Sequence, residues 1–284
     1  MRYRRGFGAV CLLLGAWLMA VGNARSLTQD RAAQAPPDPG TETRRLSLAV
    51  CPVVYQLDES ASARGYHYVF YGNAFFINKE GYLITAAHVL SDFRDGGQPF
   101  LLLRLAEAPP RLVKAEVVAI DTVHDVAVLR AVTNPFLGRY QVAYLPLNAQ
   151  KPSLGATVIA GALRPSRLKD PHSFDAPEED YAMAEVLQYT SSALVKGQAP
   201  TDLFLFSHEV IRGQSGAPVV EGTEKRAVGI VEGRWLRPTS LAAQRAVGNE
   251  NSNVGAAIPI AYAIPLLLEK KVSWQEASTP SRSE

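Results

Sequence analysis

A serine flanked by glycines, in the stretch IRGQSGAPVV (residues 211–220), is the first candidate for chemistry in this sequence. Gly213 and Gly216 lie close to Ser215, and glycine permits backbone angles that other residues avoid and lets another molecule approach the main chain. The same composition is also typical of a plain turn. Because a serine hydroxyl is a poor nucleophile at neutral pH, a catalytic role requires a base and an orienting acid elsewhere in the chain.

Five histidines could supply the base. His88 follows a β-branched run in LITAAHVL, where two alanines are small enough to let its ring lie across the floor of a cleft. His67 alternates with aromatic residues as a strand residue would, His172 lies in a polar stretch, and His124 would point away from the site. Nothing supports a specific role for His208. The sequence therefore favours His88 as the base.

The acid is sought in AIDTVHDVAVLRA, which contains two aspartates. Asp125 opens an apolar run, so we expect its carboxylate to be part-buried at the start of a strand. A buried carboxylate needs a hydrogen-bonding partner, and an imidazole is a suitable one. Asp121 is interpreted as an exposed turn residue, and we prefer Asp125.

The elements that must position these residues are predicted to be strands. From about residue 46 the chain consists of short apolar runs broken by turn residues, which indicates an antiparallel sandwich or barrel. Residues 78–81 (NKEG) are predicted to join two strands before His88. Only AIPLLLEKKV (263–272), and a short turn after His88, favour a helix.

Three other segments look different from the strand-rich region. Residues 25–45 are rich in Pro, Gln, Thr and charge and are predicted to be a flexible linker. Residues 164–182 form a long polar stretch, and a loop of this length is usually functional or disordered. Residues 269–284 are predicted to be a disordered tail.

The N-terminus indicates export. Arginines at 2, 4 and 5 precede an apolar run and a small-residue site, which makes residues 1–24 a secretory signal peptide. An uncleaved membrane anchor is the alternative.

Removing the signal takes away three of 29 basic residues and none of 27 acidic ones, which leaves a net charge of −1. The remaining chain has no positive electrostatic field that would attract nucleic acid. Cys51 is then the only cysteine, so it is predicted to be a buried structural thiol.

TAAHVL, DTVHDVAVLRA and GQSGAPVV resemble the histidine, aspartate and serine motifs of trypsin-like serine proteases, in the same chain order. The spacings are 37 residues from His88 to Asp125 and 90 residues from there to Ser215. GNAFFINKEGYLITAAHVL and VGAAIPIAYAIP are similar to the bacterial HtrA-like (DegP-like) branch. The resemblance covers roughly residues 47–268.

The resemblance implies an all-β fold of two antiparallel Greek-key β-barrels, chymotrypsin-like, with a short C-terminal helix. The protease domain would span 46–268, with the first barrel at about 46–145 and the second at about 150–268. The site would lie between the barrels. Ser215 would form the acyl-enzyme, with an oxyanion hole from the amides of Gly213 and Ser215.

The sequence departs from the family pattern at three points. Gln214 stands where the digestive enzymes carry an aspartate that pairs with a newly cut N-terminus, so we expect no activation of that kind. Ala217 replaces a second glycine after the serine. About sixteen residues follow the last recognisable strand and helix, so no PDZ domain, and no partner bound through one, is expected.

The substrate pocket is weakly indicated. Glu209 falls where trypsins place the acid of the primary pocket, which would favour Lys or Arg in the substrate. Alternatively it is solvated or pairs with Arg212. Glu232 and Arg234 would flank the same pocket, or pair with each other.

These observations predict an exported serine endopeptidase, periplasmic or secreted, that acts on protein or peptide substrates without metal or cofactor. The alternative is a catalytically silent protease-like module that binds peptides or partner proteins. Zinc-site and paired-cysteine spacings are absent from the sequence. The oligomeric state is not predicted.

Overall fold

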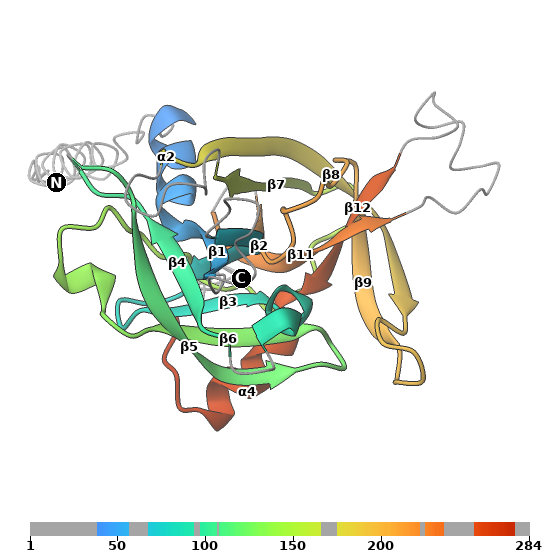
Figure 1. Cartoon of the computed structure of the whole chain (residues 1–284). Helices are drawn as coiled ribbons and strands as arrows, with labels where there is room; N and C mark the ends of the chain where they lie inside the picture. The colour runs from blue at the N-terminus through green and yellow to red at the C-terminus, as the bar shows by residue number, and fades with distance from the viewer. Residues whose placement is uncertain are drawn as a thin grey trace, which may run out of the picture. The chain divides into compact units, whose positions relative to one another are not determined.

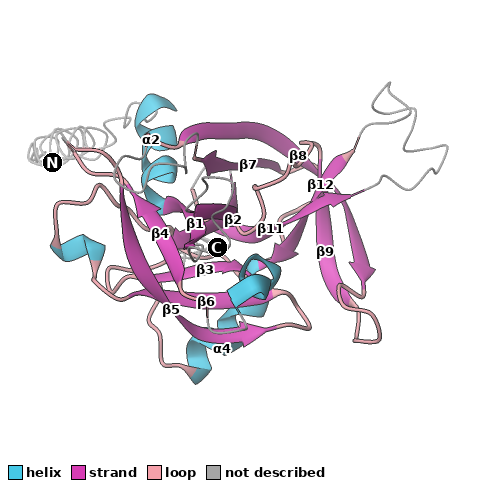
Figure 2. Cartoon of the chain, viewed as in Figure 1, coloured by secondary structure: helices cyan, strands magenta, loops and turns pink. Residues whose placement is uncertain are grey.

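The chain folds mainly into strands. The computed structural model describes residues 39–56, 68–93, 97–106, 108–165, 175–221, 225–235 and 253–275. The strands of these ranges close into two six-stranded antiparallel barrels (Figure 1, Figure 2). The predicted all-β, chymotrypsin-like fold with a short C-terminal helix is confirmed.

The first barrel has the strand order β1-β2-β3-β6-β5-β4 and closes where β4 pairs with β1. Its strands are β1 (Val50–Gln56), β2 (Tyr68–Phe76), β3 (Tyr82–Ala86), β4 (Pro99–Leu103), β5 (Arg111–Asp121) and β6 (Val126–Ala131).

The second barrel repeats this order as β7-β8-β9-β12-β11-β10 and closes where β10 pairs with β7. Its strands are β7 (Thr157–Arg164), β8 (Glu178–Ser192), β9 (Thr201–Phe206), β10 (Pro218–Glu221), β11 (Ala227–Trp235) and β12 (Val254–Pro259).

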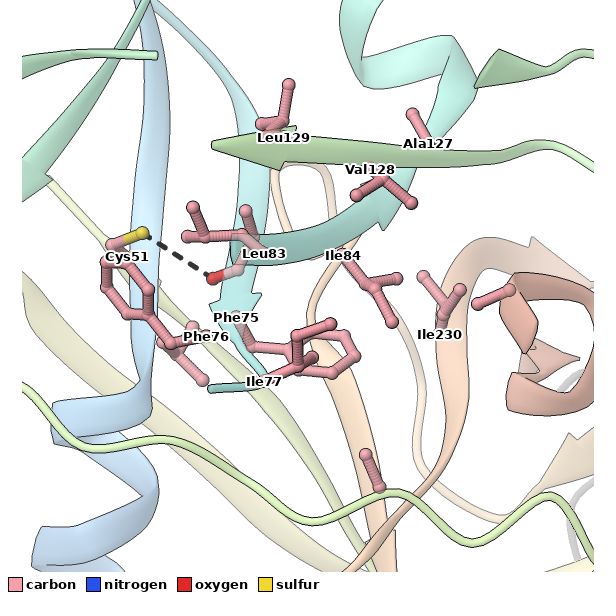
Figure 3. Close-up of a cluster of buried hydrophobic side chains, with 14 of the residues drawn as sticks. Cys51, Phe75, Phe76, Ile77, Leu83, Ile84, Ala127, Val128, Leu129 and Ile230 are labelled. Atoms are coloured by element: carbon pink, nitrogen blue, oxygen red, sulfur yellow. Dashed lines mark hydrogen bonds between the residues drawn. The ribbon is translucent and has the colours of Figure 1, made fainter. Parts of the chain in front are cut away.

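The apolar runs of the sequence fill the barrel interiors and the surface between the barrels. Phe75, Phe76 and Ile84 are fully buried, and Ile84 of β3 belongs to the same core cluster as Ile230 of β11 (Figure 3). Because one hydrophobic cluster includes strands of both barrels, the residues that each barrel presents at the junction are held in fixed relation.

Cys51 lies inside this core, as predicted for a structural thiol. It is 1% exposed, and its Sγ donates to the carbonyl oxygen of Ala74 over 3.7 Å (Figure 3). Burial raises the pKa of the thiol. A thiolate nucleophile is therefore disfavoured at this position.

The predicted turn before His88 is present. Oδ1 of Asn78 accepts hydrogen bonds from the amides of Glu80 and Tyr82, and Gly81 has φ +82°. Asparagine and glycine are suited to such a turn because one caps its own backbone and the other adopts positive φ. This turn fixes the register in which β3 leads to His88.

The predicted flexible linker at 25–45 is wrong for its last residues, because helix α2 (Pro39–Ala49) begins at Pro39. Proline suits the first turn of a helix, where its missing N–H is not needed. Leu46 and Ala49 are buried in the core of the first barrel, and this tertiary packing supports a segment with little helical pattern of its own.

The predicted disordered tail at 269–284 is likewise wrong for residues 269–275. Helix α4 (Ala263–Glu269) ends at Glu269, and the chain after it packs on the protein. Val272 is 4% exposed, the carbonyl of Ser273 accepts from Nδ2 of Asn78, and the carbonyl of Gln275 accepts from the amide of Leu147.

The polar stretch predicted as a loop at 164–182 is shorter in the structure. β7 runs to Arg164 and β8 begins at Glu178, while residues 166–174 lie outside the described ranges. The predicted signal peptide at 1–24 also lies outside them. In the described part of the chain, no helix is long and apolar enough to span a membrane.

Candidate active site

His88 is placed by the end of β3 and the short 3₁₀ helix η1 (Ala87–Phe93) that follows it. The two alanines before the histidine are buried, and the amide of Ala87 donates to the carbonyl of Asp125 over 3.0 Å. The histidine side chain itself is 44% exposed. A fixed backbone therefore presents a half-exposed ring.

Asp125 uses both carboxylate oxygens to hold His88. Oδ2 accepts from Nδ1 of the ring over 2.7 Å, and Oδ1 accepts from the backbone amide of His88 over 2.7 Å. The aspartate side chain is only 9% exposed, as expected for a carboxylate satisfied by its partner. Asp125 has φ +56°, an uncommon angle for a residue with a side chain, just before β6 pairs with β3. Because a carboxylate only accepts, the neutral ring carries its proton on Nδ1, and Nε2 then has the lone pair.

The electrostatics of the pair favour a basic ring. Partial burial of the ring lowers the pKa of His88, but the hydrogen bond to Asp125 and the charges of Asp125 and Glu232 outweigh it, so the pKa lies above its ordinary value of 6.5. Burial raises the pKa of Glu232, as does the charge of Asp125, while a charged His88 opposes the shift.

The loop that carries Ser215 requires both of its glycines. Gly213 has φ +96° and Gly216 has φ +80°. A Cβ on Gly213 would lie 2.5 Å from the ring of Phe70, and one on Gly216 would overlap the carbonyl oxygen of Asn73. Sequence reasoning expected these glycines to shape the loop, and the close packing agrees with it.

Asn73 of β2 ties the serine loop to the first barrel. Its amide donates to the carbonyl of Ser215 over 2.8 Å, and its Nδ2 donates to the carbonyl of Gly213 over 2.8 Å. Its Oδ1 accepts from the amide of Leu163 and its carbonyl accepts from Oγ1 of Thr85. Asn73 is fully buried, and these contacts satisfy its polar groups. Sequence reasoning missed this residue, because its partners are distant in sequence.

The serine loop also lies against the segment that carries His88. A Cβ added to Gly72 would lie 2.6 Å from the carbonyl oxygen of Ser215 and 2.8 Å from the side chain of Val89. Ser215 of the second barrel and Val89, the residue after His88 in the first barrel, therefore both pack against Gly72.

The hydroxyl of Ser215 is engaged by Glu232. Among the described residues, Oγ of Ser215 donates to the carbonyl of Glu232 over 3.1 Å and not to the ring of His88. The amides of Gly213 and Ser215, predicted to form the oxyanion hole, donate no hydrogen bond to any other residue that the structure describes.

A cavity of about 330 Å³ opens beside the serine. Its lining residues are Val210, Ile211, Arg212, Ser215, Gly233 and Arg234. Glu209 does not line it. The carboxylate of Glu209 is exposed, accepts from Nδ2 of Asn253 over 2.9 Å and lies 3.9 Å from Nη1 of Arg234. The structure thus pairs Glu209 with Arg234. The sequence had left a pocket position, solvation or a pair with Arg212 open for Glu209, and a pair with Glu232 open for Arg234.

The remaining histidines have other surroundings. Nδ1 of His124 lies 2.6 Å from Oδ2 of Asp121, and its ring stacks on Tyr262. His208 is part-buried, while His67 and His172 lie outside the described ranges. Within those ranges no group of three or more His, Cys, Asp or Glu side chains is placed to hold a metal ion.

Comparisons with known proteins agree with this architecture. Residues 72–230 match the family described as "Trypsin-like peptidase domain". A search of curated proteins gave no match.

Solved structures share the fold at low identity. The HtrA-type protease AlgW with a tripeptide has 18% identity and a TM-score of 0.56, over 84% of this chain and 64% of that one. The Rv3671c protease from M. tuberculosis, in its active form, has 17% identity and a TM-score of 0.55, over 86% of this chain and 91% of that one. The MamO protease domain from Magnetospirillum magneticum, in its apo form, has 17% identity and a TM-score of 0.54, over 78% and 96%. The chain therefore spans a little under two thirds of the AlgW chain and most of the other two.

Proposed function

Because the chain belongs to the trypsin-like peptidase family, we propose that it is a serine endopeptidase with Ser215 as nucleophile, His88 as general base and Asp125 as the orienting acid. The observation that carries the proposal is the two-oxygen contact of Asp125 with His88, beside a glycine-shaped serine loop.

In the first chemical step His88 takes the hydroxyl proton of Ser215 as the oxygen attacks the substrate carbonyl. Nε2 of His88 is available for this because Asp125 holds the proton on Nδ1. The hydroxyl must first rotate away from the carbonyl of Glu232, its partner in the free protein. Catalytic hydrogen bonds are often formed only in the complex with substrate.

The negative charge that develops on the substrate oxygen would be stabilised by the amides of Gly213 and Ser215. The two carbonyls that lie between these amides in the chain both accept hydrogen bonds. The carbonyl of Gly213 accepts from Nδ2 of Asn73, and the carbonyl of Gln214 accepts from the amide of Ala217. The loop is thus fixed before substrate binds, and each such donor contributes about 3 kcal/mol to catalysis in comparable sites. His88 then returns the proton to the leaving amine.

The substrates we propose are proteins or peptides in extended form. AlgW, which shares this fold, has been solved with a tripeptide and with a decapeptide. We further propose that the protein is exported to the periplasm or the outside, on the basis of the basic and apolar segment at residues 1–24.

Labelling with a fluorophosphonate probe, read by intact mass, tests the proposal. We expect one adduct on Ser215 of the purified protein, and none on Ser215→Ala or His88→Ala. A folded protein without any adduct would support the alternative, a silent module that binds peptides, because Ser215 Oγ would then be locked on Glu232.

A further inference from the structure

Gln214, the residue before Ser215, braces the serine loop from inside. It is 1% exposed, and its Oε1 accepts from the amide of Ile211 over 3.0 Å. Its own amide donates to the carbonyl of Ile211 over 3.2 Å. One buried residue thus satisfies both polar groups of Ile211, and Gly213 lies within the turn so formed.

The nitrogen of the Gln214 side-chain amide points away from the loop and contacts Asp180. Nε2 donates to Oδ2 of Asp180 over 3.0 Å. The same carboxylate oxygen lies 3.4 Å from Nε of Arg164, on the neighbouring strand β7. Two hydrogen-bonded strands of the second barrel, β7 and β8, therefore present a carboxylate to the serine loop.

The carboxylate decides which way the Gln214 amide points. A side-chain amide can donate from nitrogen and accept at oxygen, whereas an ionised carboxylate only accepts. Facing Asp180, Gln214 must present its nitrogen to β8, and its oxygen is left to receive the amide of Ile211. The opposite orientation would set oxygen against oxygen and nitrogen against an N–H group, and it would leave buried groups unsatisfied.

We propose that Asp180 is a positioning residue for the oxyanion hole, which acts through Gln214 to hold residues 211–215 in the form that directs the amides of Gly213 and Ser215 at the substrate. The inference rests on the proposed function. It gives a role to Gln214, which stands where the digestive enzymes carry the aspartate of their activation ion pair. Here the partner comes from a strand of the second barrel, so the contact forms without cleavage of the chain.

An exchange of the two polar groups tests the inference in the full-length protein. Gln214→Glu sets two carboxylates against each other, and we expect kcat on a peptide amide substrate to fall about 10²-fold, with KM changed far less, as for loss of an oxyanion donor. Asp180→Asn keeps the shape of the side chain, but an amide can both donate and accept, so it no longer fixes the orientation of the Gln214 side-chain amide. We expect a loss of about tenfold in kcat.

The double variant, Gln214→Glu with Asp180→Asn, restores the pairing with its donor and acceptor exchanged. The amide nitrogen introduced at position 180 faces the carboxylate introduced at position 214, and the total charge is kept. We therefore expect its kcat to exceed that of either single variant.

Glu179→Gln is the matched control. Glu179 precedes Asp180 on β8, is exposed and lies 3.1 Å from another arginine, Arg104, so its loss also removes a carboxylate–arginine pair. We expect kcat within about twofold of the unchanged protein, as for most surface substitutions.

The outcomes separate the inference from the proposed function. If the unchanged protein takes no fluorophosphonate adduct, the proposed function fails and the inference fails with it. If the unchanged protein is labelled, but the kcat of the double variant does not exceed that of the more active single variant, the inference alone is overturned. Melting temperatures identify a variant that does not fold. In that case Asp180→Asn decides, since kcat equal to that of the Glu179→Gln control would overturn the inference.

Discussion

In the described part of the first barrel and its turns, two histidine–aspartate pairs have nearly the same contacts. Nδ1 lies 2.7 Å from Oδ2 in the pair of His88 and Asp125, and 2.6 Å from Oδ2 in the pair of His124 and Asp121. The aspartates are only four residues apart. Contact geometry alone therefore does not distinguish a catalytic base from a structural histidine.

The surroundings of the pairs do distinguish them. His88 and Asp125 are 37 residues apart, and the segment of His88 shares Gly72 as a neighbour with the serine loop. His124 and Asp121 are three residues apart within one turn, and the His124 ring stacks on Tyr262 with centroids 4.1 Å apart. The first pair joins segments that are distant in sequence, and the serine loop lies next to the segment of His88. The second pair stabilises a single turn.

The largest expected difference between the pairs is in activity. Asp125→Asn should lower kcat about 10⁴-fold, because an amide can donate to Nδ1 and so favours the wrong tautomer of His88. Asparagine tolerates positive φ better than most residues, so the φ of +56° at this position should be kept and the variant should fold. Steady-state hydrolysis of a peptide amide, with a melting curve for each variant, measures both effects.

Asp121→Asn is the matched control in the second pair. Its Oδ1 accepts from the amides of Val123 and His124, and asparagine can accept the same bonds. We expect kcat within about twofold of the unchanged protein. Equal losses in the two variants would contradict the distinction between the pairs.

A second, intermediate difference is in the response to pH. His88 must be neutral to act as a base, and its pKa is raised, so kcat/KM should fall with acidity at a higher pH than for an isolated histidine. Glu232→Gln removes one of the negative charges that raise this pKa, and the acid limb should move to lower pH. Asp121→Asn should leave the limb in place. Profiles of kcat/KM from about pH 4 to 9 for the unchanged protein and the two variants measure the position of the acid limb. If the limb of Glu232→Gln coincides with that of the unchanged protein, the role given to the charge of Glu232 is contradicted.

Much of the fold was predictable because its signals are local. The strands, the turn at residues 78–81 and the 3₁₀ helix that contains His88 each follow from a few adjacent residues. The motifs around His88, Asp125 and Ser215 are also short and contiguous. Their resemblance to the motifs of trypsin-like serine proteases, in the same chain order, implied the two-barrel arrangement, which the structure confirms.

What the sequence could not predict depends on contacts between distant segments. Asn73 bonds to residues 12, 90 and 140 positions away, and no local pattern marks it as a polar centre. Asp180 is separated from Gln214 by 34 residues and lay in a stretch interpreted as a loop. Helix α2 forms because Leu46 and Ala49 are buried by the first barrel, not because its own sequence is strongly helical.

The smallest expected difference between the pairs is in stability. His124→Ala removes one side-chain hydrogen bond and the stack on Tyr262, which should lower the free energy of unfolding by about 1 kcal/mol and the Tm by about 2–4 °C. Activity at neutral pH should be unchanged, in contrast to variants of His88. Thermal unfolding and peptide hydrolysis on the same samples measure both.

The pH dependence of this effect identifies its source. Burial opposes the charge on Asp121, but hydrogen bonds from the His124 ring and from the amides of His124 and Val123 hold its pKa below the ordinary 3.8. A carboxyl whose pKa is lowered by folding contributes stability above its unfolded pKa, and this contribution is lost as pH falls through the folded pKa. The stability gap between the unchanged protein and His124→Ala should therefore shrink below about pH 3.8, where only the ring stack is left to distinguish them. A gap that is constant with pH would assign the whole effect to packing on Tyr262 and none to the hydrogen bond between His124 and Asp121.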